Sequence, residues 1–114
     1  MPKKQTKQAK PKKQDKAKTN EVIAVKKLLS TAPEQHSFFV ADGTMISNLA
    51  QLVDRLETMH EDTYKFHANN DKNDFSNWIR DIFEDAQLAE SLKTASNKIE
   101  AQLAIAKRLL KEVL

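Results

Sequence analysis

The sequence predicts an all-α fold, a small bundle of four to five helices with a disordered basic N-terminal tail and a long C-terminal helix. The chain of 114 residues contains one glycine and three prolines, too few for a turn-rich β fold. Apolar residues recur over long stretches with the 3.6-residue period of a helix. The length allows one domain besides a tail.

Residues 1–20 differ from the rest of the chain in charge. They contain eight lysines and one acid, a net charge of +7, whereas residues 21–114 contain 11 basic and 15 acidic side chains, a net charge of −4. Apart from Pro2 and Pro11, no side chain after Met1 in this segment is both apolar and larger than alanine, so burial cannot offset the entropy cost of ordering it. We therefore expect a disordered tail at 1–20 and a helical domain at 21–114.

The tail predicts a function. Mobile lysines attract phosphate chains by releasing counterions, without reading a base sequence. The candidate nucleic-acid-binding residues are Lys3, Lys4, Lys7, Lys10, Lys12, Lys13, Lys16 and Lys18. The tail has no arginine or aromatic residue, which argues against base-specific contacts. We expect a non-enzymatic protein associated with DNA, RNA or the ribosome, and neither a membrane nor a small-molecule substrate as a partner.

The central stretch, 67–92, predicts the core. Its apolar side chains recur on one helical face and are expected to pack against Leu49, Leu52, Val53 and Leu56: Phe75, Trp78, Ile79, Ile82 and Phe83. Asn73 or Asp74 is expected to cap this helix, and Asp85 to cap another that begins near Ala86.

Shorter elements are expected before this centre. The pattern predicts a helix at Glu21–Leu29, a helical turn near Thr31–Glu34, an extended segment at 38–40, a turn at 41–43, a helix from Thr44 to about Met59, a short helix from Thr58–Glu61 to His67, and a loop at 69–72. The single glycine, Gly43, is expected to adopt a backbone angle that other residues resist.

The C-terminal segment, 86–114, has a heptad pattern. Its seam is Leu92, Ser96, Ile99, Leu103, Ala106, Leu110 and Val113. A continuous helix here is about 43 Å long, whereas a body of this size is roughly 32 Å across. The helix therefore overhangs the body or breaks near 94–97. The alternative function is an interaction or oligomerisation module, in which a homodimer pairs through Ile99, Leu103, Leu110 and Val113 and the tail only aids solubility.

Two resemblances follow from these motifs. The tail repeats PKKQTK at 2–7 as PKKQDK at 11–16 and resembles the lysine-rich tails of linker histones and bacterial histone-like proteins. Residues 36–92 resemble a small helical domain family of archaea and bacteria with no assigned function. Its signature is a His before N-D-F-x-x-W-[IV]-x-D and then D-x-x-L-A. The matching residues are Phe38, Gly43, Leu49, Leu52, Leu56, Tyr64, His67, Asn73, Asp74, Phe75, Trp78, Ile79, Asp81, Asp85, Leu88 and Ala89.

The chain offers few groups for catalysis or metal binding. It has no cysteine and three histidines, His36, His60 and His67. No nucleophile, phosphate-loop or zinc pattern accompanies them. We expect no catalytic residue, no metal and no cofactor, with His67 bound to a carboxylate or to the loop at 73–74. The carboxylates of Asp74, Asp81 and Asp85 form the alternative, a site for acid–base chemistry.

The sequence also suggests a compartment. It has no apolar run of about 18 residues and no apolar segment behind the N-terminal lysines. We expect a cytoplasmic protein.

Overall fold

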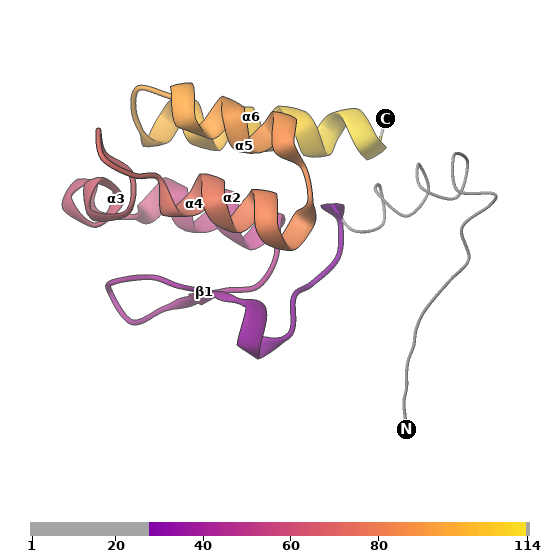
Figure 1. Ribbon diagram of the computed structural model, residues 1–114, viewed down its shortest axis with the longest axis horizontal. Helices are drawn as coiled ribbons and strands as arrows, with labels where there is room; N and C mark the ends of the chain where they lie inside the picture. Colours follow the sequence, from indigo (N-terminus) through magenta and orange to yellow (C-terminus); the bar gives the residue numbers. More distant parts are fainter. Residues whose placement is uncertain (1–27, 114) are drawn as a thin grey trace.

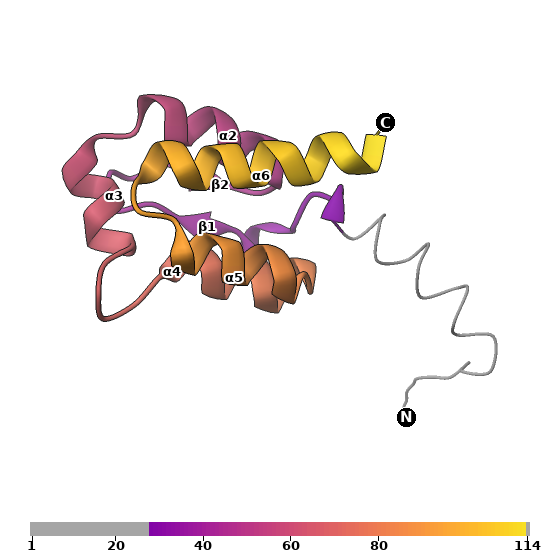
Figure 2. The ribbon, with the colours of Figure 1, turned by 90° about the horizontal axis from the view of Figure 1, so that it is seen from above.

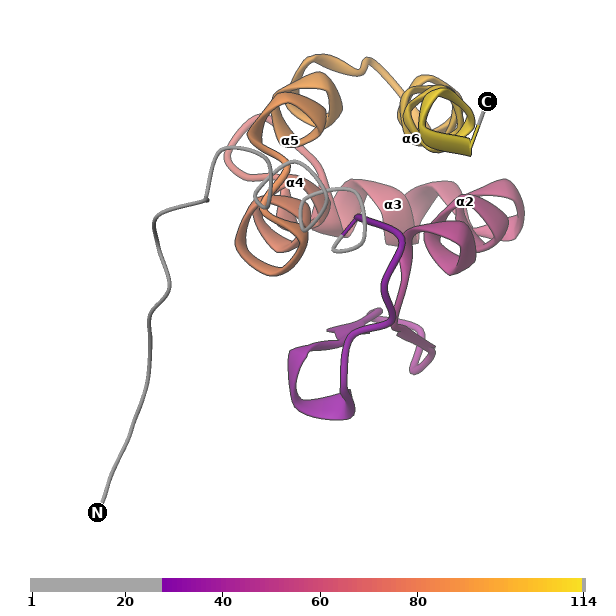
Figure 3. The same ribbon diagram turned by 90° about the vertical axis from the view of Figure 1, so that its right-hand side faces the viewer.

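The computed structural model describes residues 28–113, without the side chain of Val113. Its elements are η1 (Glu34–His36), β1 (Phe38–Phe39), β2 (Met45–Ile46), α2 (Leu49–Thr58), α3 (Glu61–His67), α4 (Asp74–Trp78), η2 (Ile79–Phe83), α5 (Ala86–Thr94) and α6 (Lys98–Val113). The β1–β2 hairpin lies below a layer of α2, α3 and α4, and α5 and α6 lie above that layer (Figures 1 and 3). The predicted all-α bundle is confirmed, with the hairpin as an addition.

Most of the N-terminal predictions cannot be compared with the fold. The predicted tail at 1–20 lies outside the described residues. The predicted helix at 21–29 also lies outside them, except for its last two residues. The chain is described from Leu28, which is buried in the core and 1% exposed.

The predicted helix from Thr44 to Met59 is wrong at its start. Met45 and Ile46 form β2 and pair antiparallel with β1, with Phe38 opposite Ile46. The turn that joins the strands contains Gly43 at φ +94°, the left-handed angle expected of it. Helix α2 begins only after Asn48, whose side chain accepts a hydrogen bond from the Gln51 N–H at 2.8 Å. Met45 and Ile46, which the apolar period assigned to the helix, therefore form a strand instead.

Helix α3 and the loop after it occur where the sequence predicts them. The helix spans Glu61–His67, but its N-cap is His60, which makes no side-chain capping bond. The expected capping box of Thr58 and Glu61 is therefore not what starts this helix. In the following loop, the Asn69 side-chain oxygen accepts a hydrogen bond from the Asp71 N–H at 2.9 Å.

Both predicted caps in the central stretch are confirmed. Asn73 caps α4 by accepting a hydrogen bond from the Ser76 N–H at 3.0 Å. Asp85 caps α5 in the same way through the Leu88 N–H at 3.0 Å. Between them the chain widens into the π-turn η2, which ends at Glu84 in a left-handed conformation, φ 59°. The first predicted helix is therefore α4 continued by η2, and the second, α5, begins at Ala86 as predicted.

The core forms around the aromatic face of α4. Phe75 is fully buried and stacks on Phe38 of the hairpin, with ring centroids 4.8 Å apart. Trp78 is 8% exposed, and its indole N–H donates a hydrogen bond to the His36 carbonyl at 2.8 Å. The predicted core residues are buried in one cluster that also contains Leu49, Leu52 and Leu56, and Val53 and Ile82 pack against this cluster as partly buried residues.

The C-terminal segment is two helices. The chain leaves the helical conformation at Ala95, φ −67° and ψ 135°, inside the predicted break at 94–97. The Asn97 side chain then accepts from the Glu100 N–H at 2.9 Å, and Glu100 accepts in return from the Ser96 N–H at 2.8 Å. Helix α6 returns beside α2 (Figure 2). Of the two alternatives for 86–114, an overhanging helix and a break near 94–97, the structure shows the break. None of the described helices is long and apolar enough to cross a membrane.

Substitutions at Trp78 test the role of this core. Trp78→Ala is expected to lower the free energy of unfolding by about 3–5 kcal/mol, because it removes a large buried aromatic side chain. Trp78→Phe retains most of the packing and loses the bond to His36, so a smaller loss of about 0.5–1.5 kcal/mol is expected. Urea denaturation of both variants measures the difference. Equal losses in the two variants would contradict the packing role.

Candidate functional site

One face of α6 is apolar and exposed. Ile99, Leu103 and Leu110 are 68%, 52% and 54% exposed, and Ala106 lies between them, partly buried. We call these four residues the α6 stripe. Three of them belong to the predicted partner interface, and the side chain of its fourth member, Val113, lies outside the described residues. Spacings of four and three residues place the stripe on one helical face.

A different face of α6 packs on the body. Ala101 and Ile105 are fully buried, four residues apart. Two polar side chains fasten the same helix to carbonyl groups at α2. The Gln102 amide donates to Val53 at 2.8 Å, and the Lys98 ammonium donates to Met59 at 2.5 Å. The α6 stripe is therefore not the surface that holds this helix in place.

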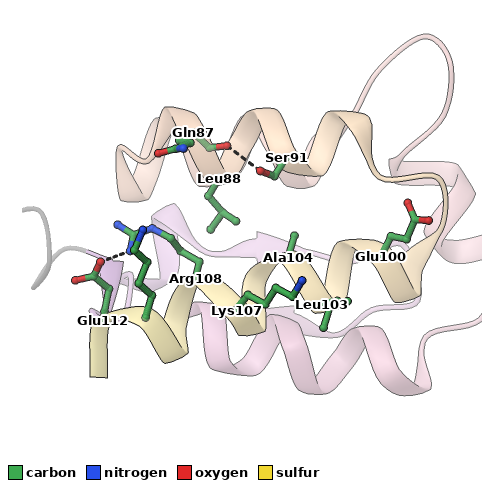
Figure 4. A pocket seen from close by; sticks show the side chains of 10 residues that line it. Gln87, Leu88, Ser91, Glu100, Leu103, Ala104, Lys107, Arg108 and Glu112 are labelled. Atoms are coloured by element: carbon green, nitrogen blue, oxygen red, sulfur yellow. Dashed lines mark hydrogen bonds and ion pairs between the residues drawn. The ribbon is translucent and has the colours of Figure 1, made fainter. Parts of the chain in front are cut away.

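A groove of about 520 Å³ runs between α5 and α6 (Figure 4). Its lining is Gln87, Leu88, Ser91, Glu100, Leu103, Ala104, Lys107, Arg108, Lys111 and Glu112. Leu88 points from α5 toward α6 (Figure 4). Among the lining residues of α6, the acid Glu100 lies near the start, whereas three basic side chains and one acid lie nearer the end: Lys107, Arg108, Lys111 and Glu112. Charge along this flank of α6 thus changes sign from one end to the other.

Arg108 is engaged within the body. Its guanidinium donates to Asp85 at 2.8 Å and also to Glu112. The hydrogen bond to Glu112 is the main reason why the pKa of Arg108 is raised, and Asp85 adds to it against the effect of burial. Lys107 and Lys111, in contrast, form no ion pair with any residue that the structure describes. They are the cations of this flank that remain open to a partner.

An apolar notch lies on the other flank of α6. It measures about 260 Å³ and is formed by Ala50 and Val53 of α2 and by Ala106, Leu109 and Leu110 of α6. We call it the α2–α6 notch. Its two alanines leave the room that larger side chains would fill. The notch lies beside the C-terminal end of the α6 stripe, while Ile99 is at the other end.

His67 joins the hairpin to α4. The imidazole is buried, 5% exposed, and its Nε2 accepts from the Ala41 N–H at 3.0 Å. Because the backbone can only donate there, Nδ1 carries the proton in the neutral ring and donates to the Asp74 carboxylate at 3.0 Å. The expected bond between His67 and a carboxylate is confirmed. The geometry is that of a structural joint with a defined tautomer.

The other candidate acids do not converge. Asp81 is exposed and pairs with its neighbour Arg80 at 3.1 Å. Asp85 caps α5 and binds Arg108. Within residues 28–113, no three histidine, aspartate or glutamate side chains gather as a metal site would require. His36 and His60 are both exposed.

None of the eight tail lysines lies among the described residues, so their role stays a prediction. Residues 28–113 contain nine basic and 14 acidic side chains, a net charge of −5. The basic flank of α6 was not predicted from the sequence. The signal was present, since Lys107 and Lys111 are four residues apart beside the heptad seam and therefore lie on one helical face.

Comparison with known proteins adds no relative. No family model matches the chain, and no curated protein or solved structure matches it. The resemblances to a small helical family and to histone-like tails stay predictions.

The joint at His67 predicts an effect of acid on stability. Burial raises the pKa of Asp74, but hydrogen bonds and electrostatic attraction from Lys72 and His67 together outweigh it, so the pKa is lowered from 3.8. A lowered pKa in the folded state stabilises the fold above the unfolded pKa, and this contribution is lost as the pH falls through the folded value. Asp74→Asn is therefore expected to be less stable than wild type at neutral pH. The difference between their free energies of unfolding is expected to shrink as the pH falls.

Urea denaturation of wild type and variant between pH 7 and pH 2 measures this gap. Lys72→Gln serves as a control, because it removes a 2.8 Å ion pair of Asp74 but leaves His67 in place. The loss of unfolding free energy caused by Asp74→Asn is expected to be smaller in the Lys72→Gln background than in the wild-type background. A gap that does not change with pH would contradict the assigned interaction.

Proposed function

We propose that this is a non-enzymatic, nucleic-acid- or ribosome-associated protein that binds phosphates through its lysine tail. The observation that carries the proposal is the division of charge. Residues 1–20 have a net charge of +7, whereas the described body, 28–113, has a net charge of −5. A polyanion is attracted to the first region and repelled by the second. This separation favours a tail that acts alone over a basic surface on the body.

The composition of the tail limits what it recognises. Lysine is a point charge on a flexible stem, whereas the forked guanidinium of arginine suits base edges. All eight basic residues of the tail are lysine, and no aromatic side chain is available to stack on a base. We therefore assign the tail to the phosphate backbone of DNA or RNA, without sequence preference. Ribosomal RNA and a cytoplasmic location are consistent with this chemistry.

The acidic body restricts the contact. Four exposed acids lie close together in sequence where α2 ends and α3 begins: Asp54, Glu57, Glu61 and Asp62. Like charges repel a phosphate chain over roughly a Debye length, about 8 Å at physiological salt. The body therefore keeps a bound strand at a distance and leaves the contact to the tail.

The engagement of the carboxylates supports a non-enzymatic role. Asp74 is held by His67 and Lys72, and Asp85 by Arg108 and the cap of α5. Both acids therefore have a structural role that explains their positions. A general acid or base also needs a substrate within hydrogen-bond reach, in a cleft that holds it.

A second candidate is an interaction or oligomerisation module. The exposed α6 stripe favours it, because contiguous apolar side chains on a surface helix are typical of a contact face. In this function the lysine tail is a solubilising extension. Removing the tail separates the two candidates.

Binding through the tail predicts a strong dependence on salt. If most of the seven net charges engage duplex DNA, log affinity against log salt is expected to fall with a slope of roughly −5 to −6, since each neutralised phosphate contributes about 0.9. The chain without residues 1–20 is expected not to bind. Fluorescence titrations of both proteins against a random duplex and a structured RNA, at several salt concentrations, measure these quantities.

The control replaces the eight tail lysines by glutamine in the full-length chain, which preserves its length. Binding that survives this change, or the truncation, would place the site on the helical body. A slope near zero for the intact protein would rule out an electrostatic mechanism even where binding occurs.

A further inference from the structure

We propose that the α6 stripe is covered by the same stripe of a second copy of this chain, with the two α6 helices antiparallel. This deepens the second candidate function and does not depend on the tail. The stripe has exposed apolar side chains over about three turns, and the opposite face of α6 already packs on the body. Three features of the described residues point to a second copy in this orientation.

The first feature is the match of large and small side chains. An antiparallel alignment centred between Ala104 and Ile105 places Ile99 opposite Leu110 of the second copy. It also places Leu103 opposite Ala106 of the second copy. Leu103 then meets the small Ala106, and Ile99 meets Leu110, which borders the α2–α6 notch, so both levels can interdigitate. Because the alignment is symmetric, each contact occurs twice.

The second feature is the α2–α6 notch. A two-fold symmetric interface needs a protrusion and a matching recess on the same subunit, since each copy supplies both. Ile99 is the most exposed of the large apolar side chains and lies at the N-terminal end of the stripe. The notch lies at the C-terminal end. Antiparallel pairing brings Ile99 of each copy to the notch of the other.

The third feature is charge. Glu100 and Lys107 lie on the same flank of the stripe, on the side of the groove between α5 and α6. In the antiparallel alignment, Glu100 of one copy and Lys107 of the other are offset along the helix axis by about two residues, or roughly 3 Å. Glu100 of each copy then faces Lys107 of the other. A parallel pair would place the basic ends of both helices, with Lys107 and Lys111, side by side, and like charges would repel.

The expected affinity is moderate. Helix α6 has 16 residues and is therefore about 24 Å long. One pair of such helices gives an interface at the small end of the specific range, roughly 1,200 Å² or less. Dimers are therefore expected to form in the micromolar range and to dissociate on dilution.

Sedimentation of the full-length protein without nucleic acid tests the dimer at concentrations from about 1 to 500 μM, chosen to span this affinity. Leu103→Glu is expected to weaken association at least tenfold. Phe39→Glu is the matched control, because Phe39 is similarly exposed, 59% against 52% for Leu103, and lies on the hairpin. Circular dichroism checks that both variants are folded. A monomeric wild type, or equal sensitivity to both substitutions, would overturn the proposal.

Cysteine cross-linking tests the orientation, and the absence of native cysteine makes it direct. In the antiparallel pair two copies of Ile99 are about 16 Å apart along the axis, too far for a disulfide, which needs Cα atoms within roughly 7 Å. Ile99→Cys and Leu110→Cys are therefore expected to cross-link when mixed, but not separately. Cross-linking of either variant with itself alone would instead indicate parallel helices and overturn the alignment.

The effect of the Glu100–Lys107 pair on dimer affinity can be measured separately. Glu100→Gln keeps an acceptor for the Ser96 N–H and removes the charge, and Lys107→Gln removes the opposite charge. Each is expected to weaken the dimer several-fold, and the double variant less than the product of the two effects, because the two residues form one interaction. Independent effects would rule out the assigned pair. All three tests use protein alone, so their outcome is separate from that of nucleic-acid binding.

Discussion

The fold depends on hydrogen bonds that the side chains of Asn73, Ser76 and Trp78, in α4 and at its N-cap, make with the layers above and below this helix. Ser76 is fully buried and donates to the Ala89 carbonyl at 2.6 Å, and Asn73 donates to the Leu92 carbonyl at 3.1 Å, so α5 is fastened at two points. On the other side, Trp78 binds the His36 carbonyl. A five-residue helix is not stable alone. It persists because these bonds and the aromatic stack around Phe75 hold it from both faces.

Local signals explain which parts of this fold could be predicted. Asn73 and Asp85 are recognised as caps because a cap needs only its own side chain and the next turn. Ile46 shows the limit of such reasoning. It fits the apolar period of the following helix, but it pairs with Phe38, eight residues earlier, and the strand bond is the one formed. A two-residue strand has too short a pattern to reveal this pairing.

In the candidate site too, features set by local sequence could be predicted and features set by tertiary contacts could not. The heptad spacing of Ile99, Leu103 and Leu110 predicted an apolar face, and the structure exposes it. The second apolar face of α6, at Ala101 and Ile105, could not be recognised from the sequence, because alanine occurs at both packed and exposed positions. The α2–α6 notch could not be predicted, since it exists only where α2 and α6 dock. Likewise, the partner of His67 Nε2 is Ala41, 26 residues away.

The geometry of α6 connects the two proposals. The described chain begins at the end of the molecule where α6 finishes (Figure 2). Antiparallel helices place these two ends apart, so the chain would enter the two bodies of a dimer at opposite ends of the paired helices, about 24 Å apart or more. Duplex DNA carries a charge about every 1.7 Å, so if both proposals hold, the two tails of one dimer would be able to bind separate stretches of one phosphate chain. Binding by the first tail would then raise the effective concentration of the second. In that case a moderate dimer affinity would suffice, because a shared nucleic acid and the α6 contact would stabilise each other.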